Sequence, residues 1–391
     1  MLPLTREEYD MNVLMLSIDR GLLGKGQLGD VVERHIEYGK RVERLDIIVM
    51  SKKGYDINKI SDNVTAYPTN SNGTIGFILD AIKIGKKFKG IDLIVCQDPI
   101  VGLAGYFIKK KTGAKLLINL HGDYVGNKLS KDRRYNSWWG SLISKFVLNR
   151  ADAIRVMSQG MMDRLIKMGF DSNKIKVIST PVDIERFIRY PDVKQENKKQ
   201  IESLASSKMQ KGKKHILMVG RKDKVKDFDT LCRAINLVHD KYKNVGLWLV
   251  GNYHFGPEGV GTLPLKQEIK DSIVVSFNEK SKDLPAYYYS SYLTVLSSTS
   301  ESFGKVLVEA NACGKPVVAT ETTGAKEIVQ DGYNGFLVPI GDAEALAEKI
   351  FELLNDPKKA KKMGEDGRKL VKEKFSNNTQ KIITYWKEIV A

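Results

Sequence analysis

Two glutamates flank an expected helix start in residues 300–314, SESFGKVLVEANACG. Glu301 lies in a polar loop, and Glu309 lies inside the helix that we expect after Gly304. Free N–H groups in the first turn of a helix favour a phosphate, and the helix dipole adds to that attraction. Because helical side chains tilt toward the N-terminus, the Glu309 carboxylate is expected to point back toward the ligand and to accept hydrogen bonds from sugar hydroxyls. The segment favours a nucleotide, although taken alone the glutamates also fit a solvated loop and an exposed helix face.

Two cations follow an apolar run at residues 215–219. Gly220 and Arg221 come directly after the run, and Lys226 follows five residues later. A guanidinium binds phosphate oxygens in pairs and an ammonium acts as a point charge, so the two could neutralise a diphosphate. An ordinary turn of mixed charge fits the same residues.

His121 is the histidine best placed for chemistry, because it follows the apolar run 115–120 directly. A structural histidine is the alternative. We expect no site at His35, His239 or His254. In the N-terminal stretch GLLGKGQLGD, Gly24 and Gly26 predict a loop that could approach a phosphate, without the spacing of a dinucleotide fingerprint.

No metal site is predicted. Asp227 and Asp229 lie at a helix start, where capping explains them better than metal binding. No other cluster of histidines and carboxylates has ligand spacing. The three cysteines are far apart and in apolar contexts, which predicts reduced thiols in a cytoplasmic protein.

The elements that must position these residues alternate between strand-like and helical patterns. Short apolar runs bounded by Gly, Asp or Pro predict buried parallel strands in a doubly wound α/β fold. We expect one Rossmann-like domain over residues 1–187, a charged linker over 188–214, and a second such domain over 215–376. The stripe of Ile382, Ile383, Trp386 and Ile389 predicts that the last helix packs on another surface, the first domain being the candidate. Ligands of such sheets bind at the carboxyl ends of the strands, so a cleft between two domains is expected. The expected strands are 12–17, 44–50, 93–96, 115–119, 153–157, 175–178, 215–219, 245–250, 273–277, 292–297 and 336–339.

The chain has 391 residues and a formal net charge of +16. That charge favours an anionic substrate or membrane surface, since no nucleic-acid-binding signature accompanies it. No apolar run approaches the roughly 18 residues of a membrane span, and the N-terminus does not read as a signal peptide. One helix pattern combines aromatic and basic residues and fits either core packing or peripheral membrane binding. Its residues are Trp138, Trp139, Leu142, Ile143, Phe146, Arg133, Arg134 and Lys145.

Taken together, these motifs resemble glycosyltransferase family 4, whose members have the GT-B architecture of two facing Rossmann-like domains. The resemblance covers nearly the whole chain and is strongest over residues 220–339. The matching segments are Gly220, Arg221 and Lys226; residues 275–277; ESFGKVLVE; GKPVVAT; Gly324; NGFLVP; His121 with Gly122; RADAIRVMS; and Pro181-Val182-Asp183.

The resemblance implies a retaining transfer from a nucleotide-diphosphate sugar to a glycan or lipid-linked acceptor, without a metal or other cofactor. Arg221 and Lys226 would hold the diphosphate, Glu309 the ribose, and His121 the transferred sugar. Glu301 would lie beside the donor sugar. The transfer would proceed either through Glu301 as a covalent nucleophile or by a same-face attack that the leaving phosphate assists. Further donor-binding positions by this resemblance are Gly26, Gly220, Phe277, Phe303, Gly304, Lys305 and Val306.

The chain departs from the family pattern at two places. Asp227 replaces the glycine usual after the second cation, and Thr180-Pro181 replaces the usual Asn-Gly. Three other functions remain open: a nucleotide-sugar epimerase, a phosphorylase with lysine-bound pyridoxal phosphate, or a basic nucleotide- or RNA-binding protein without catalysis. We expect a cytoplasmic enzyme of cell-surface polysaccharide or glycolipid synthesis, either free in the cytoplasm or peripheral on the membrane.

Overall fold

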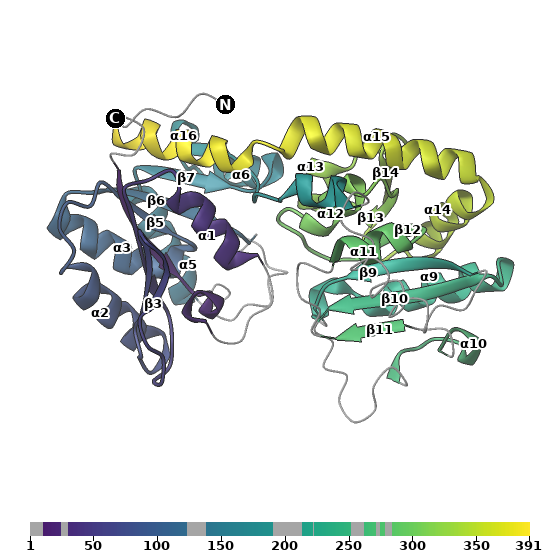
Figure 1. Cartoon of the computed structure of the whole chain (residues 1–391), viewed down its shortest axis with the longest axis horizontal. Coiled ribbons are helices and arrows are strands. Elements are labelled where there is room, and N and C mark those ends of the chain that lie inside the picture. The colour runs from purple at the N-terminus through teal and green to yellow at the C-terminus, as the bar shows by residue number, and fades with distance from the viewer. Residues whose placement is uncertain are drawn as a thin grey trace. The chain divides into compact units, whose positions relative to one another are not determined.

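The chain folds into two compact units in a computed structural model (Figure 1). The structure describes residues 11–24, 30–122, 138–190, 213–221, 223–251, 262–270, 274–277 and 284–391, without the side chains of 138 and 274–277. The first unit comprises Met1–Ser179 with Asn377–Ala391, and the second comprises Thr180–Ser376. The C-terminal helix therefore belongs to the first unit.

The first unit is built on an eight-stranded sheet in the order β3-β4-β2-β1-β5-β6-β7-β8. All neighbours pair in parallel except β3 and β4. The central strands are almost completely buried, which explains their continuous apolar sequences. The strands are β1 (Asn12–Ser17), β2 (Arg44–Val49), β3 (Asn58–Ser61), β4 (Val64–Pro68), β5 (Leu93–Cys96), β6 (Lys115–Leu120), β7 (Ala153–Val156) and β8 (Ile175–Val177).

Helices cover this sheet on both faces. On one face Trp386 of α16 packs with Met15 of β1 and stacks at 5.3 Å on Tyr38 of α1. On the other face α3 lies so close to the sheet that a Cβ on Gly105 would meet the Cys96 sulfur at 2.5 Å. The helices are η2 (Arg20–Leu23), α1 (Val31–Gly39), α2 (Gly73–Gly85), α3 (Pro99–Thr112), α5 (Trp138–Arg150), α6 (Gln159–Lys167), η3 (Ser172–Lys174) and α16 (Asn378–Val390).

The second unit contains a six-stranded parallel sheet in the order β11-β10-β9-β12-β13-β14. Its strands are β9 (Lys214–Val219), β10 (Val245–Gly251), β11 (Val274–Phe277), β12 (Leu293–Leu296), β13 (Val317–Thr320) and β14 (Gly335–Val338). Its helices are α7 (Ile184–Ile188), η5 (Lys224–Lys226), α9 (Phe228–Lys241), α10 (Gln267–Lys270), α11 (Leu284–Ser290), α12 (Lys305–Ala312), α13 (Thr323–Ile328), α14 (Ala343–Asn355) and α15 (Pro357–Phe375).

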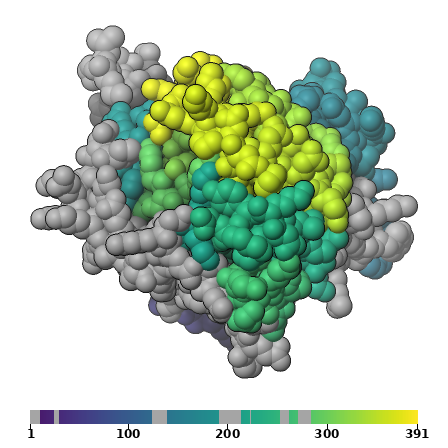
Figure 2. All heavy atoms as spheres, turned by 90° about the vertical axis from the view of Figure 1, so that its right-hand side faces the viewer, coloured from purple at the N-terminus to yellow at the C-terminus, as the bar shows by residue number. Residues whose placement is uncertain are grey.

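The core of the second unit lies between this sheet and the helices α9 and α14. The side chains that meet there are completely buried, among them Met218, Leu231, Leu249 and Ile350. Figure 2 shows the molecule from the right-hand side of Figure 1, where yellow residues near the C-terminus lie beside green residues of the second unit. A continuous apolar layer fixes the strand ends from which the candidate site is built.

The predicted α/β class with two Rossmann-like sheets is confirmed. The sequence did not predict the antiparallel pair β3 and β4, because β3 is short, polar and only partly buried at the sheet edge. The boundary falls at Ser179 and Thr180, so residues 180–187 lie in the second unit and not in the first. Most of the expected linker, residues 191–212, lies outside the described residues. Within the described residues, no helix is both long and apolar enough to cross a membrane.

Candidate active site

The second sheet changes winding direction between β9 and β12. These strands are neighbours, but the chain continues from β9 to β10 on one side and from β12 to β13 on the other. The loops after such a pair diverge, and ligands of open α/β sheets bind there. The loop after β9 carries Gly220, Arg221 and Lys226, and the loop after β12 carries Ser297 to Glu301. The topology therefore brings two predicted parts of the site to one edge.

Hydrogen bonds brace these two loops against each other. The Ser297 hydroxyl lies 2.8 Å from the carbonyl oxygen of Lys226, to which it donates. The backbone N–H of Thr299 donates to the carbonyl oxygen of Val225 at 2.8 Å. Asp227 ends the turn with φ of 44° and accepts a hydrogen bond from the N–H of Thr230, which caps α9. The backbone that carries Lys226 is held on both sides, and the predicted capping role of Asp227 is confirmed.

Lys226 and Glu301 form an ion pair at this edge. The Lys226 Nζ lies 2.5 Å from Glu301 Oε1, and the Ser298 hydroxyl donates to the same oxygen at 2.8 Å. Each side chain of the pair is 16% exposed. Partial burial strengthens the attraction between the two charges relative to a fully solvated pair. The pair fixes an ammonium group at the strand end, and Glu301 positions it.

The expected helix start lies beside the pair. Gly304 has φ of 85°, a left-handed conformation that favours glycine, and α12 begins at Lys305. Its N-cap residue, Gly304, has no side chain that could cap the first turn. Gly324 donates its N–H to the Glu301 carbonyl at 2.8 Å, and a Cβ on Gly324 would lie 2.3 Å from the backbone nitrogen of Phe303. Gly324 thus allows the close backbone contact that sets the path of the loop into the helix.

Glu309 has a different environment from the one that the sequence suggested. Its side chain is buried within the unit, where the Tyr288 hydroxyl donates to Oε2 at 2.7 Å. Oε1 lies 3.7 Å from the Nζ of Lys305, so the two residues, one helical turn apart, form an ion pair. The Tyr288 hydroxyl therefore holds Oε2 of Glu309, while Oε1 faces Lys305 at the start of the helix.

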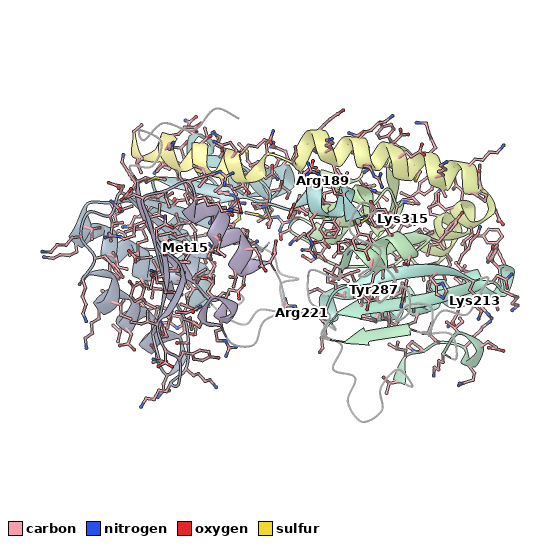
Figure 3. The ribbon with its side chains drawn as sticks, in the orientation of Figure 1. Met15, Arg189, Lys213, Arg221, Tyr287 and Lys315 are labelled. Carbon is pink, nitrogen blue, oxygen red and sulfur yellow. The ribbon has the colours of Figure 1, made fainter. Side chains whose placement is uncertain are left out.

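Other predicted donor residues differ in how the structure places them. Arg221 is exposed at the end of β9, as labelled in Figure 3. A Cβ on Gly220 would meet Lys226 Cε at 3.3 Å, so Gly220 keeps room for that side chain. The Phe303 side chain is buried and packs edge-on against Phe375. Gly26 and the side chain of Phe277 lie outside the described residues.

His121 follows β6 in the first unit, at the carboxyl edge of that sheet. Its Nε2 hydrogen-bonds Gln97 Oε1, so in the neutral ring Nε2 carries the proton and Nδ1 is the basic nitrogen. Burial, followed by the charges of Arg155, Arg34 and His35, holds the pKa of His121 well below its usual value. A histidine with this pKa is neutral near pH 7 and suits polar contact with a sugar.

His35, at which the sequence predicted no site, has polar contacts that connect it to His121. It is buried, and its two ring nitrogens lie 2.6 Å from the Val31 carbonyl oxygen and 3.2 Å from Met15 Sδ. Gln97 Nε2 contacts the same sulfur at 3.0 Å, so Met15 (Figure 3) joins His35 to the Gln97 and His121 pair. Burial is the main cause that lowers the pKa of His35 to about 4.

Arg155 is a buried cation of the same unit. Its guanidinium donates to the carbonyl oxygens of Ile178 at 2.8 Å and Ser179 at 3.0 Å. Burial lowers its pKa to about 10. Sequence reasoning missed Arg155, Gln97 and Tyr288, of which only Gln97 carried a signal, as the polar residue directly after a buried strand.

Within the described residues, no group of three or more His, Cys, Asp or Glu side chains could hold a metal ion. The three cysteines are buried and unpaired by disulfides, and burial raises the pKa of Cys232 to about 12.

Comparisons with known proteins match both halves of the chain to one enzyme class. Residues 199–370 match the sequence profile of "Glycosyl transferases group 1", and residues 44–186 match "Glycosyltransferase Family 4". The chain is 29% identical over 378 residues to an uncharacterised glycosyltransferase of Methanocaldococcus jannaschii, covering 94% of each chain. It is 26% identical to the N-acetyl-alpha-D-glucosaminyl L-malate synthase of Bacillus anthracis, over 73% of this chain and 71% of that protein.

Two further matches extend the comparison. The capsular polysaccharide biosynthesis glycosyltransferase CapM of Staphylococcus aureus is 32% identical over 41% of each chain. The crystal structure of Anabaena HepE superposes with a TM-score of 0.74 at 21% identity, over 97% of this chain and 100% of that one, which supports the fold alone.

Proposed function

The chain belongs to glycosyltransferase family 4 and has the GT-B fold, and from this premise we propose that it transfers a sugar from a nucleotide diphosphate to an acceptor with retention of configuration and without a metal ion. The observation that carries the proposal is the braced Lys226 and Glu301 pair at the winding switch of the second sheet, beside the start of α12.

The leaving diphosphate gains negative charge as the glycosidic bond to it breaks. Fixed donors aimed at that charge stabilise the transition state more than the ground state, and removing one such donor typically costs about 10²–10³ in rate. Lys226 supplies a positioned ammonium group, Arg221 an exposed guanidinium, and the first turn of α12 supplies N–H groups of Lys305 and Val306. These protein groups would do the work that a divalent cation does elsewhere.

The glutamates take separate roles in this proposal. Glu301 holds Lys226 and faces the donor sugar, while Oε1 of Glu309 accepts hydrogen bonds from the ribose once Lys305 moves aside. The Tyr288 hydroxyl keeps Glu309 in one orientation for that contact. His121 contacts the transferred sugar as a neutral imidazole. We favour a same-face attack assisted by the leaving phosphate, because the ion pair with Lys226 and the hydrogen bond from Ser298 stabilise the Glu301 carboxylate and make it a weaker nucleophile.

The donor and acceptor are proposed from the relatives. Anabaena HepE is described in complex with UDP and glucose, so a UDP-hexose is the first donor to test. CapM acts in capsular polysaccharide biosynthesis and the Bacillus anthracis relative makes a malate glycoside, so acceptors vary among relatives. We favour a glycan or lipid-linked acceptor in polysaccharide or glycolipid synthesis, in the cytoplasm.

A turnover screen of UDP-, GDP- and ADP-sugars tests the proposal by measuring nucleotide release with and without added acceptors, in the presence of a metal chelator. We expect release of one nucleoside diphosphate, unchanged by the chelator, and an α-linked product from an α-linked donor. Loss of all turnover with the chelator would contradict the metal-independent proposal. Conversion of the donor sugar without any acceptor would identify an epimerase instead.

A further inference from the structure

Three neighbouring helices of the first unit expose large apolar side chains on one face. Helix α3 packs between α2 and α5: a Cβ on Gly85 of α2 would meet Ile108 of α3 at 2.3 Å, and Tyr106 of α3 stacks edge-on at 5.2 Å on Phe146 of α5. The layer covers the sheet face opposite α1 and α16 (Figure 1). Five of the large apolar side chains that are exposed in the described residues lie on it, namely Ile75, Leu79, Phe107, Trp139 and Leu142. We call this surface the α2–α3–α5 face.

The exposed apolar side chains follow helical spacing on each outer helix. Ile75 and Leu79 are four residues apart on α2 and are 77% and 62% exposed. Trp139 and Leu142 are three residues apart on α5, and Trp139 is 67% exposed. Residues at these spacings share one side of a helix, so each pair forms an outward apolar stripe. Adjacent stripes of this kind mark a surface that binds another apolar phase.

The same helices are almost free of acids. Asp80 is the one acidic residue in the sequences of α2, α3 and α5, and its carboxylate accepts a hydrogen bond from the Ser71 hydroxyl at 2.7 Å. The cations of the three helices are Lys83, Lys109, Lys110, Lys111, Lys145 and Arg150, and Lys86, Lys87 and Lys89 follow α2 directly. Of these, Lys109 pairs with Asp152, just after α5, at 2.6 Å. The surface therefore combines exposed apolar groups with an excess of positive charge.

Helix α15 shows that positive charge alone does not make such a surface. It too is rich in lysine, but Lys359 pairs with Glu352 and Lys362 pairs with Asp366. No large apolar side chain is exposed on α14, α15 or α16, which the structure describes completely. Helix α15 has the composition of a solvated helix, whereas the α2–α3–α5 face has that of an interfacial one.

We propose that the α2–α3–α5 face binds the surface of an anionic lipid bilayer, with the apolar stripes in the headgroup region and the lysines on lipid phosphates. The chemistry that points to a bilayer is the joint presence of both groups over three helices, since a nucleic acid would not need the apolar stripes and a protein partner would not need such an excess of positive charge. The sequence alone had suggested α5 only; the structure adds α2 and α3. The inference does not depend on sugar transfer, because binding needs neither donor nor acceptor.

Co-sedimentation with vesicles tests this proposal on the full chain. The expected result is binding to vesicles that contain phosphatidylglycerol, little binding to phosphatidylcholine vesicles, and loss of binding as salt is raised. The double variant Lys110→Glu and Lys111→Glu should weaken binding by about 30-fold or more, since each cation near the surface contributes about 1 kcal/mol. The matched control is Lys358→Glu with Lys369→Glu, two exposed positions of α15 that change the net charge equally and should leave binding within about twofold.

A second variant separates the apolar contribution from the charge. Leu79→Gln with Trp139→Gln keeps every charge and should still weaken vesicle binding about tenfold or more, because both side chains leave water in the bound state. Equal loss in the α15 control, or no binding of the wild-type chain to anionic vesicles at low salt, would overturn the proposal. So would a result in which the α2–α3–α5 variants lose RNA binding or self-association while vesicle binding is unchanged.

Discussion

The carboxyl edges of the two sheets differ in the groups that contact their basic side chains. In the second unit, ammonium groups meet carboxylates, as in Lys226 with Glu301 and Lys305 with Glu309. In the first unit, basic groups sit beside neutral oxygen and sulfur atoms, as in His121 with Gln97 and Arg155 with two carbonyl oxygens. One edge holds its cations in place, and the other keeps its histidines uncharged.

This difference indicates which edge binds the diphosphate of a nucleotide sugar and which edge contacts its sugar. Fixed cations and the N–H groups of a helix start stabilise the charge that develops on a diphosphate. A neutral imidazole can instead hydrogen-bond hydroxyl groups of a sugar or an acceptor without attracting the phosphate. The second edge is therefore the donor edge of our account.

The largest expected effect comes from the donor edge. Lys226→Ala removes the positioned cation and should lower kcat/KM by about 10²–10³. Glu301→Gln retains the hydrogen-bonded position but loses the charge that holds Lys226, so we expect a loss of about tenfold or more through a lower kcat. Steady-state kinetics with the preferred donor measures both. Full activity of both variants, with folded protein by circular dichroism, would remove the catalytic role of the pair.

Gly324→Ala should lower turnover by about 10²-fold, although the residue bears no chemical group. Its Cβ would lie 2.3 Å from the Phe303 nitrogen, and the backbone from Glu301 to Gly304 would have to shift. A displacement of about 1 Å in a positioned group can have an effect of this size. Gly76→Ala is the control, since its Cβ would meet only ordinary contact at 3.5 Å. Equal kinetics for the two variants would show that the loop path is not set there.

The histidines of the first edge predict a pH dependence of stability. Burial lowers the pKa of His35 to about 4 from a model-peptide value of 6.5, so between these values the unfolded chain binds more protons than the folded chain. The stability that neutral His35 provides is therefore present above pH 6.5 and is lost as the pH falls toward 4, by about 3 kcal/mol in all.

Urea unfolding between pH 7 and pH 4.5 measures this dependence. His35→Gln cannot titrate and should flatten the curve, while the remaining slope reports other groups whose pKa is lowered by burial, among them His121, His215 and His239. A curve that is as steep for the variant as for the wild-type chain would mean that His35 is charged in the folded state.

The smallest expected effect concerns the anchor of Glu309. Tyr288→Phe leaves a buried carboxylate oxygen without its hydroxyl donor, which should lower the free energy of unfolding by about 1–3 kcal/mol. We also expect a rise in KM for the donor with a smaller change in kcat, because Glu309 is assigned to ribose binding. Thermal unfolding and steady-state kinetics on the same preparation measure both. An unchanged KM with the expected loss of stability would give Glu309 a structural role only.

Much of this arrangement could be predicted from the sequence, for local reasons. Buried parallel strands have continuous apolar runs, and the residues that follow them, such as Gly220, His121 and Ser297, must lie at the carboxyl edges. The α12 start and the capping role of Asp227 were also readable, because helix starts have a local chemistry.

The remaining features depend on contacts distant in sequence. Lys226 and Glu301 are 75 residues apart, and Tyr288 and Glu309 are 21 apart, so no spacing rule joins them. The burial of Phe303 and His35 could not be predicted, because an aromatic ring or an imidazole has the same local pattern in a core and in a site. Whether such a side chain is buried is decided by tertiary packing, here against Phe375 and Met15.

The central claim is that Lys226 holds the diphosphate, and calorimetric binding of the nucleoside diphosphate released in the donor screen tests it most directly. Lys224→Ala is the matched control, because Lys224 is exposed on the same turn, η5. Our account predicts that Lys226→Ala weakens binding by about tenfold or more, as expected for loss of a charge-assisted hydrogen bond, while Lys224→Ala binds within about twofold of wild type. Equal affinity of all three proteins would contradict it.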